Sequence, residues 1–212
     1  MPEELSPLQT FWNVFAVLAQ DVRRCIKVLE DGQVTDPNEI MFWDRALARS
    51  VFALIEGTAY SMAWLAYTYV NVYKEVTLSA VEIEELKNSY DFDEAKESNP
   101  ELDRSRLLNK IQWTFDLFAR VHKVDRFPLS ELTEWAFMKE IFRNKQGLAH
   151  PRTAEELTVY EENRETLIEG TQWFIERVVD LLKECRDGME AYDPDAATEG
   201  DTGGTDPSDL IM

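Results

Sequence analysis

The sequence predicts an all-α fold, an up-and-down helical bundle with extra helices and a disordered acidic C-terminal tail. Apolar residues recur at steps of three and four along most of residues 5–185, which is the period of an amphipathic helix. No segment alternates between apolar and polar residues for long enough to indicate a β-strand. Of the 212 residues 44% are hydrophobic, enough for one well-buried domain. We therefore expect a single helical domain over residues 1–187 and a flexible tail over 188–212.

The first predicted helix covers residues 6–30 and begins at Ser6 and Pro7, a typical helix start. Its apolar residues alternate steps of four and three and so share one face: Phe11, Phe15, Leu18, Val22, Cys25 and Leu29. This face suits a partner helix in the same chain or in a second copy, and we favour a partner in the same chain.

The bundle proper is expected over residues 36–187 and opens with a long central helix that starts at Asp36 and Pro37. The segment from Val51 to Ile55 is apolar on every face, so we expect neighbours all around it. Glu56 follows directly, and a carboxylate in such surroundings needs a cation or several hydrogen-bond donors.

Four further segments complete the predicted bundle. They are a short acidic helix over residues 79–90, a helix that ends near Lys123, a helix from Pro128 to about Lys145 that Gly147 stops, and a long final helix through Cys185. Residues 91–103 form a polar connection between the first two. Two capping boxes, Thr153 with Glu156 and Thr158 with Glu161, mark helix starts before the final helix. His122 is expected at the surface.

The charge of the chain limits its partners. Asp and Glu total 41 against 22 Lys and Arg, giving a net charge of −19, so the surface as a whole repels nucleic acid and anionic membranes. The two cysteines lie far apart and no signal peptide is visible, which indicates a cytoplasmic protein. The uncharged run 57–73 is short of the roughly 20 residues of a membrane span.

Common nucleotide-binding and hydrolase motifs and zinc-type ligand spacings are absent from the sequence. We therefore predict neither a cofactor nor a metal, and no membrane contact. One short segment, RNKQGLAH at residues 143–150, combines Arg143, Asn144 and His150 near a predicted helix end. On a continuous helix Arg143 and His150 would be about two turns, or roughly 10 Å, apart on nearly the same face. Pro151 favours a His150 placed just past the helix end.

These side chains suit phosphodiester chemistry. A histidine titrates near neutral pH and can transfer a proton, while an arginine binds a phosphate through two parallel hydrogen bonds. Because RNA supplies its own 2′-hydroxyl nucleophile, a proton-transfer group and charge stabilisation would suffice without a metal. Lys139, Lys145 and Arg152 make this one of the few locally basic places on the chain.

The RNKQGLAH segment, after a long helical hairpin, resembles the Rx4-6H motif of the HEPN (higher eukaryotes and prokaryotes nucleotide-binding) superfamily, with six intervening residues. The helical layout is similar over about residues 36–184. The resemblance implies a helical bundle that forms a homodimer, with a shared cleft lined by the arginine and histidine of both copies. It also implies a metal-independent endoribonuclease of toxin–antitoxin or antiphage type, in which Arg143 holds the phosphate, His150 transfers the proton and Asn144 orients one of them.

Some HEPN proteins carry a tyrosine two residues after the histidine as a site of modification, and Arg152 occupies that position here. The segment RSVFALIEG, residues 49–57, is similar to the inner helix of small uncharacterised helical proteins with RNxxxxHP-type signatures. Its physical interpretation is that Glu56 pairs with Arg143 or Arg49 in the interior.

Three alternatives remain open at this point. In the first, the same residues are structural: Arg143 clamps a core carboxylate, Asn144 caps a helix and His150 binds a turn. In the second, the protein is a non-catalytic helical interaction or dimerisation module whose N-terminal apolar face or C-terminal DLIM segment recruits a protein partner; an antitoxin would be the partner of the ribonuclease instead. In the third, an acidic chain of charge −19 mimics nucleic acid and inhibits a basic partner.

Overall fold

The computed structural model describes residues 7–32, 34–73, 78–88, 100–125, 127–149, 153 and 155–190. These residues form six α-helices and two short 3-10 helices and contain no β-strand, which confirms the predicted all-α bundle. The elements are α1 (Pro7–Glu30), α2 (Pro37–Tyr73), α3 (Ala80–Asn88), α4 (Pro100–Val121), η1 (Leu129–Glu131), α5 (Trp135–Ala149), η2 (Glu155–Leu157) and α6 (Glu161–Glu190). The predicted tail, apart from residues 188–190 at the end of α6, lies outside the described residues.

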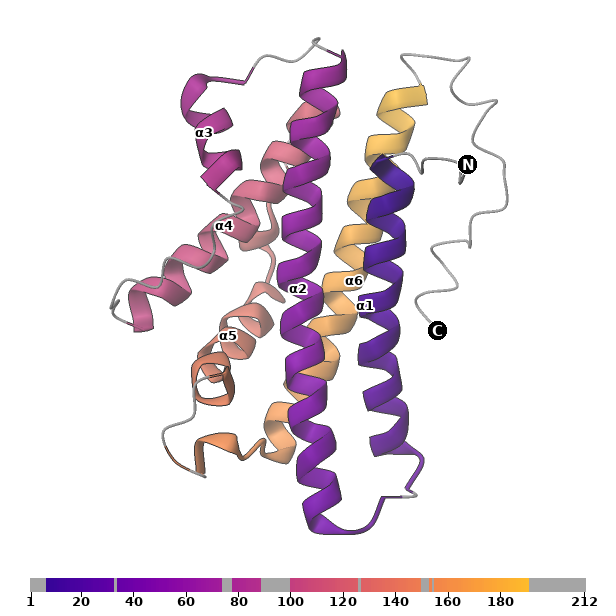
Figure 1. Cartoon of the computed structure of the whole chain (residues 1–212), viewed down its shortest axis with the longest axis vertical. Helices are drawn as coiled ribbons and strands as arrows, with labels where there is room; N and C mark the ends of the chain where they lie inside the picture. Colours follow the sequence, from indigo (N-terminus) through magenta and orange to yellow (C-terminus); the bar gives the residue numbers. More distant parts are fainter. Residues whose placement is uncertain are drawn as a thin grey trace, which may run out of the picture.

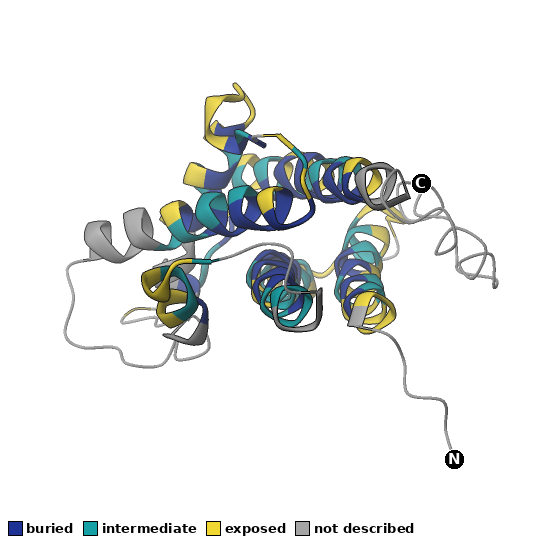
Figure 2. Cartoon of the chain, turned by 90° about the horizontal axis from the view of Figure 1, so that it is seen from above, coloured by how far each residue is buried: buried dark blue, intermediate teal, exposed yellow. Residues whose placement is uncertain are grey.

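Helix α2 is the centre of the molecule (Figure 1). It contacts each of the other five α-helices, and its most extensive contact is with the antiparallel helix α1. Seen from above, α1, α2 and α3 lie in one layer, and α4 and α6 lie behind them (Figure 2). The apolar face predicted for the first helix packs against α2, with Phe11, Phe15, Val22 and Cys25 all buried. The predicted internal partner is therefore confirmed.

The segment of residues 51–55 in the middle of α2 was predicted to have neighbours on every face, but one of its faces is open. Val51, Phe52, Leu54 and Ile55 are buried, but Ala53 is exposed. A small apolar residue costs little at the surface, so hydrophobicity alone does not reveal which side of the helix is open.

Two predicted boundaries of α5 are wrong. The chain after Pro128 first forms the 3-10 helix η1, and α5 begins only at Trp135. The helix also continues through Gly147 to Ala149, because Leu148 in its last turn is buried in the core. Tertiary packing here outweighs the roughly 1 kcal/mol that a glycine costs in a helix.

The second predicted capping box, Thr158 with Glu161, does not start a helix at Thr158. The backbone N–H groups of Asn163 and Arg164 both donate to the carbonyl of Tyr160, so α6 begins at Glu161 and not at the predicted Thr158. In the turn before it, Thr153 forms a hydrogen bond with Glu155. Backbone hydrogen bonding is the larger contribution that lowers the pKa of Glu155, and the bond with Thr153 lowers it further. The side chain of Glu156, the predicted partner of Thr153, lies outside the described part of the structure.

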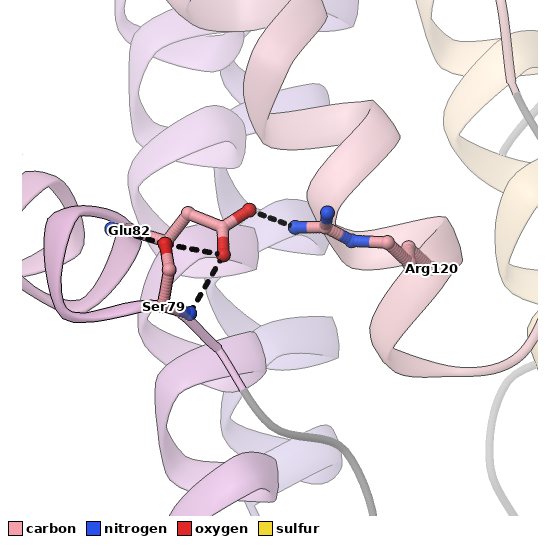
Figure 3. Close-up of polar contacts among 3 residues, drawn as sticks. All are labelled: Ser79, Glu82 and Arg120. Carbon is pink, nitrogen blue, oxygen red and sulfur yellow. Dashed lines mark hydrogen bonds and ion pairs between the residues drawn. The ribbon is translucent and has the colours of Figure 1, made fainter.

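A capping box that sequence analysis missed starts α3 (Figure 3). The Ser79 backbone N–H and hydroxyl donate to Glu82 Oε2 at 2.8 and 2.9 Å, and the Glu82 N–H donates to Ser79 Oγ at 3.2 Å. Arg120 of α4 forms an ion pair with Glu82 Oε1. The hydrogen bond from the Arg120 guanidinium is the largest effect that lowers the pKa of Glu82, and the hydrogen bond from the Ser79 backbone lowers it further. The cap therefore also fixes α3 against α4.

His122, predicted at the surface, is buried with 5% of its area exposed. Its ring lies 4.2 Å from that of Phe118 and 4.7 Å from that of Tyr69 of α2, measured between centroids, and its Nδ1 is 2.8 Å from the Phe118 carbonyl oxygen. The helix ends here because Lys123 adopts φ +60°, and the N–H groups of Lys123 and Val124 donate back to Arg120 and Ala119. Burial lowers the pKa of His122.

None of the described helices contains a stretch that is long and apolar enough to cross a bilayer.

Candidate functional site on helix α5

Helix α5 is held tightly between α2 and α6. Phe142 stacks on Phe52 of α2 with 6.3 Å between ring centroids, and Met138 and Ile141 are buried on the same side. Gly170 of α6 allows a close approach, because a Cβ atom there would lie 2.9 Å from Phe137 Cβ and 2.7 Å from Ile141 Cδ1. The position of α5 is therefore fixed by packing on two neighbours.

The opposite side of α5 faces solvent and carries two cations. Lys139 and Arg143 are both exposed and lie one helical turn apart, so their side chains share one face. Arg143 forms an ion pair with Glu140, and the two side chains are 60% and 32% exposed. A pair this exposed contributes at most about 1 kcal/mol and breaks readily when a stronger anion arrives. This face can bind an anionic ligand.

The other predicted site residues are only partly placed. Asn144 and Lys145 belong to α5, but their side chains lie outside the described part of the structure, as do His150 and Arg152 entirely. The structure thus brings together Lys139 and Arg143. The catalytic roles of Asn144 and His150 stay predictions.

The structure does not place Arg143 in the interior, where the structural interpretation expected it to clamp a core carboxylate. Its side chain is 60% exposed and pairs with Glu140, while Glu56 is partly buried on α2. The physical reason is the direction of α5, which buries Ile141 and Phe142 and turns the next residue outward.

A different arginine pairs with a buried carboxylate of α2. Arg164, in the first turns of α6, donates from Nε and a terminal nitrogen to the two carboxylate oxygens of Asp44 at 2.6 and 2.8 Å. Asp44 is 1% exposed and lies on the buried face of α2. Its helical spacing from Ile40 and Leu47 is the signal that could have revealed it.

Other reactive groups are placed where they have little access to a substrate. Cys25 and Cys185 are both buried, and burial raises the pKa of Cys185 to about 12. Among the described residues no group of three or more His, Cys, Asp or Glu could hold a metal ion. Two shallow hollows on α1 are lined by Arg23, Arg24 and Lys27, but also by Asp21, Glu30 and Asp31. The first hollow holds Arg23, Arg24 and Lys27 against Asp21 alone and is therefore a second basic surface, whereas the second hollow balances Arg23 and Lys27 against Glu30 and Asp31.

The chain matches no protein-family model, and no curated protein or solved structure is significantly similar to it. The HEPN resemblance is therefore carried by the RNKQGLAH segment, and the described structure agrees with it only in being an all-α bundle.

Proposed function

We propose that the protein is a HEPN-like, metal-independent endoribonuclease of toxin or antiphage type, with its site at the C-terminal half of α5. The observation that supports this most is the exposed pair of cations, Lys139 and Arg143, on a chain whose net charge is −19. On so acidic a protein, an anionic polymer must be bound at a local basic surface.

The proposed reaction uses the RNA 2′-hydroxyl as the nucleophile. A base removes the 2′-hydroxyl proton, the O2′–P bond forms, the P–O5′ bond breaks, and the leaving 5′ oxygen takes up a proton. His150 performs one of these proton transfers, and Arg143 neutralises the charge that develops on the phosphate oxygens. Asn144 orients one of the two. Lys139, Lys145 and Arg152 hold neighbouring phosphates, and Arg143 exchanges Glu140 for phosphate when RNA binds.

Cleavage of total cellular RNA in the presence of EDTA tests this proposal. We expect the wild-type protein to cut RNA, and His150→Ala and Arg143→Ala each to lose roughly 100-fold or more of the activity while keeping the helical circular dichroism spectrum. Arg120→Ala is the matched control and should keep the activity. It also removes an arginine from an exposed ion pair, but on α4 and outside the candidate site on α5. Intact RNA with the wild type, or equal activity in all variants, would refute the proposal.

A second candidate is a non-catalytic interaction module. Exposed apolar side chains on the outer helices favour it: Phe42 is 56% exposed and Val17 58%. Binding to a partner that survives Arg143→Ala and His150→Ala, without any RNA cleavage, would support this alternative. A partner that is basic and is released by added salt would instead indicate nucleic-acid mimicry by the acidic chain.

A further inference from the structure

The first hollow on α1 is a basic surface separate from the candidate site on α5. It is lined by Gln20, Asp21, Arg23, Arg24 and Lys27, so three cations stand against one carboxylate. We call it the α1 basic hollow. Arg24 and Lys27 are exposed and lie three residues apart, so their side chains share one face of the helix. On a chain of net charge −19, such a surface attracts an anionic ligand.

Arg24 and Lys27 are the two cations of the α1 basic hollow that can bind such a ligand directly. Arg23 is partly buried and already interacts within its own chain, so it adds positive charge without serving as a binding group. In the ranges that the structure describes, no ion pair engages Arg24 or Lys27. A carboxylate that arrives at these two side chains therefore displaces no described partner.

The last part of the chain carries the charge that fits this hollow. Six carboxylates follow the end of α6, without any Lys or Arg among them: Asp193, Asp195, Glu199, Asp201, Asp206 and Asp209. We call residues 193–209, which lie outside the described residues, the acidic segment. One exposed ion pair is weak, but several carboxylates tethered to the same chain reach the hollow at a high effective concentration.

The arrangement of the helices lets the acidic segment reach α1. Helix α6 ends at Glu190, at the same end of the molecule as the start of α1 (Figure 1). From Pro7 to Lys27, α1 rises by about 30 Å. Since an extended chain covers about 3.3 Å per residue, about 10 to 15 residues after Glu190 are enough to reach the hollow. Helix α5 lies on the opposite side of α2 from α1 (Figures 1 and 2).

We propose that the acidic segment binds the α1 basic hollow of its own chain, with carboxylates around Glu199 and Asp201 paired with Arg24 and Lys27. The occupant is this segment because it combines the opposite charge, a sufficient length and a start at the same end of the molecule as α1. Bound there, it neutralises the hollow and keeps other polyanions from α1, so that the basic face of α5 stays open to them. This inference does not rest on the proposed ribonuclease activity.

A carbodiimide cross-link tests the contact in the full-length protein, because this reagent joins a lysine amine directly to a carboxylate that touches it. Trypsin leaves residues 187–212 as one peptide, since no Lys or Arg follows Arg186. Mass spectrometry should find this peptide linked to Lys27, with the link between residues 193 and 209, and only little of it linked to Lys139. A mixture of isotope-labelled and unlabelled protein should show that both ends of the link belong to one molecule.

Charge variants test the cause of the contact. Arg24→Glu keeps the lysine that is cross-linked, and it should lower the yield of the Lys27 link by about threefold or more, because an exposed pair is replaced by a repulsion. Added salt should lower the wild-type yield as well. Arg143→Glu, the same charge change on the exposed face of α5, is the matched control and should leave the yield unchanged.

The rate of lysine acetylation provides a second measurement that needs no cross-link. Replacing three carboxylates of the acidic segment, by Asp195→Asn, Glu199→Gln and Asp201→Asn, should speed acetylation of Lys27 by about twofold or more, because the amine is less often paired. Lys139 should react at an unchanged rate. A link to Lys139 in place of Lys27, a link only between two molecules, or a Lys27 yield and acetylation rate that these variants leave unchanged would overturn the proposal.

Discussion

Two kinds of arginine–carboxylate pair occur in this protein. A buried pair stabilises the fold, whereas the arginine of an exposed pair can also bind a ligand. Arg164 binds Asp44 through two hydrogen bonds, and the Asp44 side chain is 2% exposed. Arg143 and Glu140 are 60% and 32% exposed. Removing one partner of a buried pair leaves an uncompensated charge, whereas an exposed charge returns to water.

We therefore expect Arg164→Ala to lower the free energy of unfolding by about 3 kcal/mol or more, because Asp44 is left buried without its cation. Arg143→Ala should lower it by less than about 1 kcal/mol. Urea unfolding followed by circular dichroism measures both. Similar losses in the two variants would show that the exposure of the pairs does not govern their contribution.

His122 gives the stability of the protein a pH dependence. Because burial lowers the pKa of its imidazole from the usual 6.5, the unfolded chain binds a proton at a higher pH than the folded one. Its contribution to stability is complete above about pH 6.5 and is lost as the pH falls from there through the folded pKa. Thermal melts between pH 7.5 and 5 should show a falling midpoint, and His122→Phe should flatten that slope. An unchanged slope in the variant would assign the effect to other groups.

At the scale of the elements, the position of α5 depends on one glycine of α6. Gly170→Ala would place a methyl group 2.9 Å from Phe137 Cβ, an atom that cannot move without α5 itself. We expect a loss of about 1 to 3 kcal/mol in unfolding free energy from this overpacking, with a fall in any RNA cleavage at the same time.

Gly57→Ala on α2 is the matched control for this substitution. A methyl group there would meet only the Cδ1 atom of Leu18 at 2.7 Å, the far end of a flexible side chain. Alanine also favours the helix by up to about 1 kcal/mol over glycine, so this variant should be neutral or stabilised. Chemical denaturation of the pair distinguishes the cases, and equal losses would contradict the tight α5–α6 contact.

At the scale of the whole molecule, hydrophobic periodicity predicted the helical fold well, because each amphipathic face is a local property of the sequence. It failed where contacts between distant segments determine the burial of a residue or the end of a helix. His122 is buried because the turn at Lys123 directs it against Tyr69, and α5 passes Gly147 because Leu148 is in the core. The Arg164–Asp44 pair joins residues 120 positions apart, and no local pattern specifies such a partner.

For the candidate site, the sequence predicted which residues share a helix face but not the direction in which that face points. Lys139 and Arg143 are four residues apart, so a helix alone places them on one face. Whether that face points inward or outward depends on which neighbours α5 packs against, and the outward direction of Arg143 follows from Phe52 and Gly170. The position of His150 relative to Arg143 stays a prediction.

The pairing of α1 with α2 also bears on how the chain acquires its fold during synthesis. The two helices adjoin in sequence, and a short turn lets them form the most extensive contact of the molecule as soon as residue 73 is available. Contacts between segments that are adjacent in sequence cost little loop-closure entropy. We therefore expect the α1–α2 hairpin to form first, while the chain is still on the ribosome. The face of α2 that receives α4, α5 and α6 then stays exposed until the last helix emerges. The nascent chain must be kept from aggregating through that face for most of its translation.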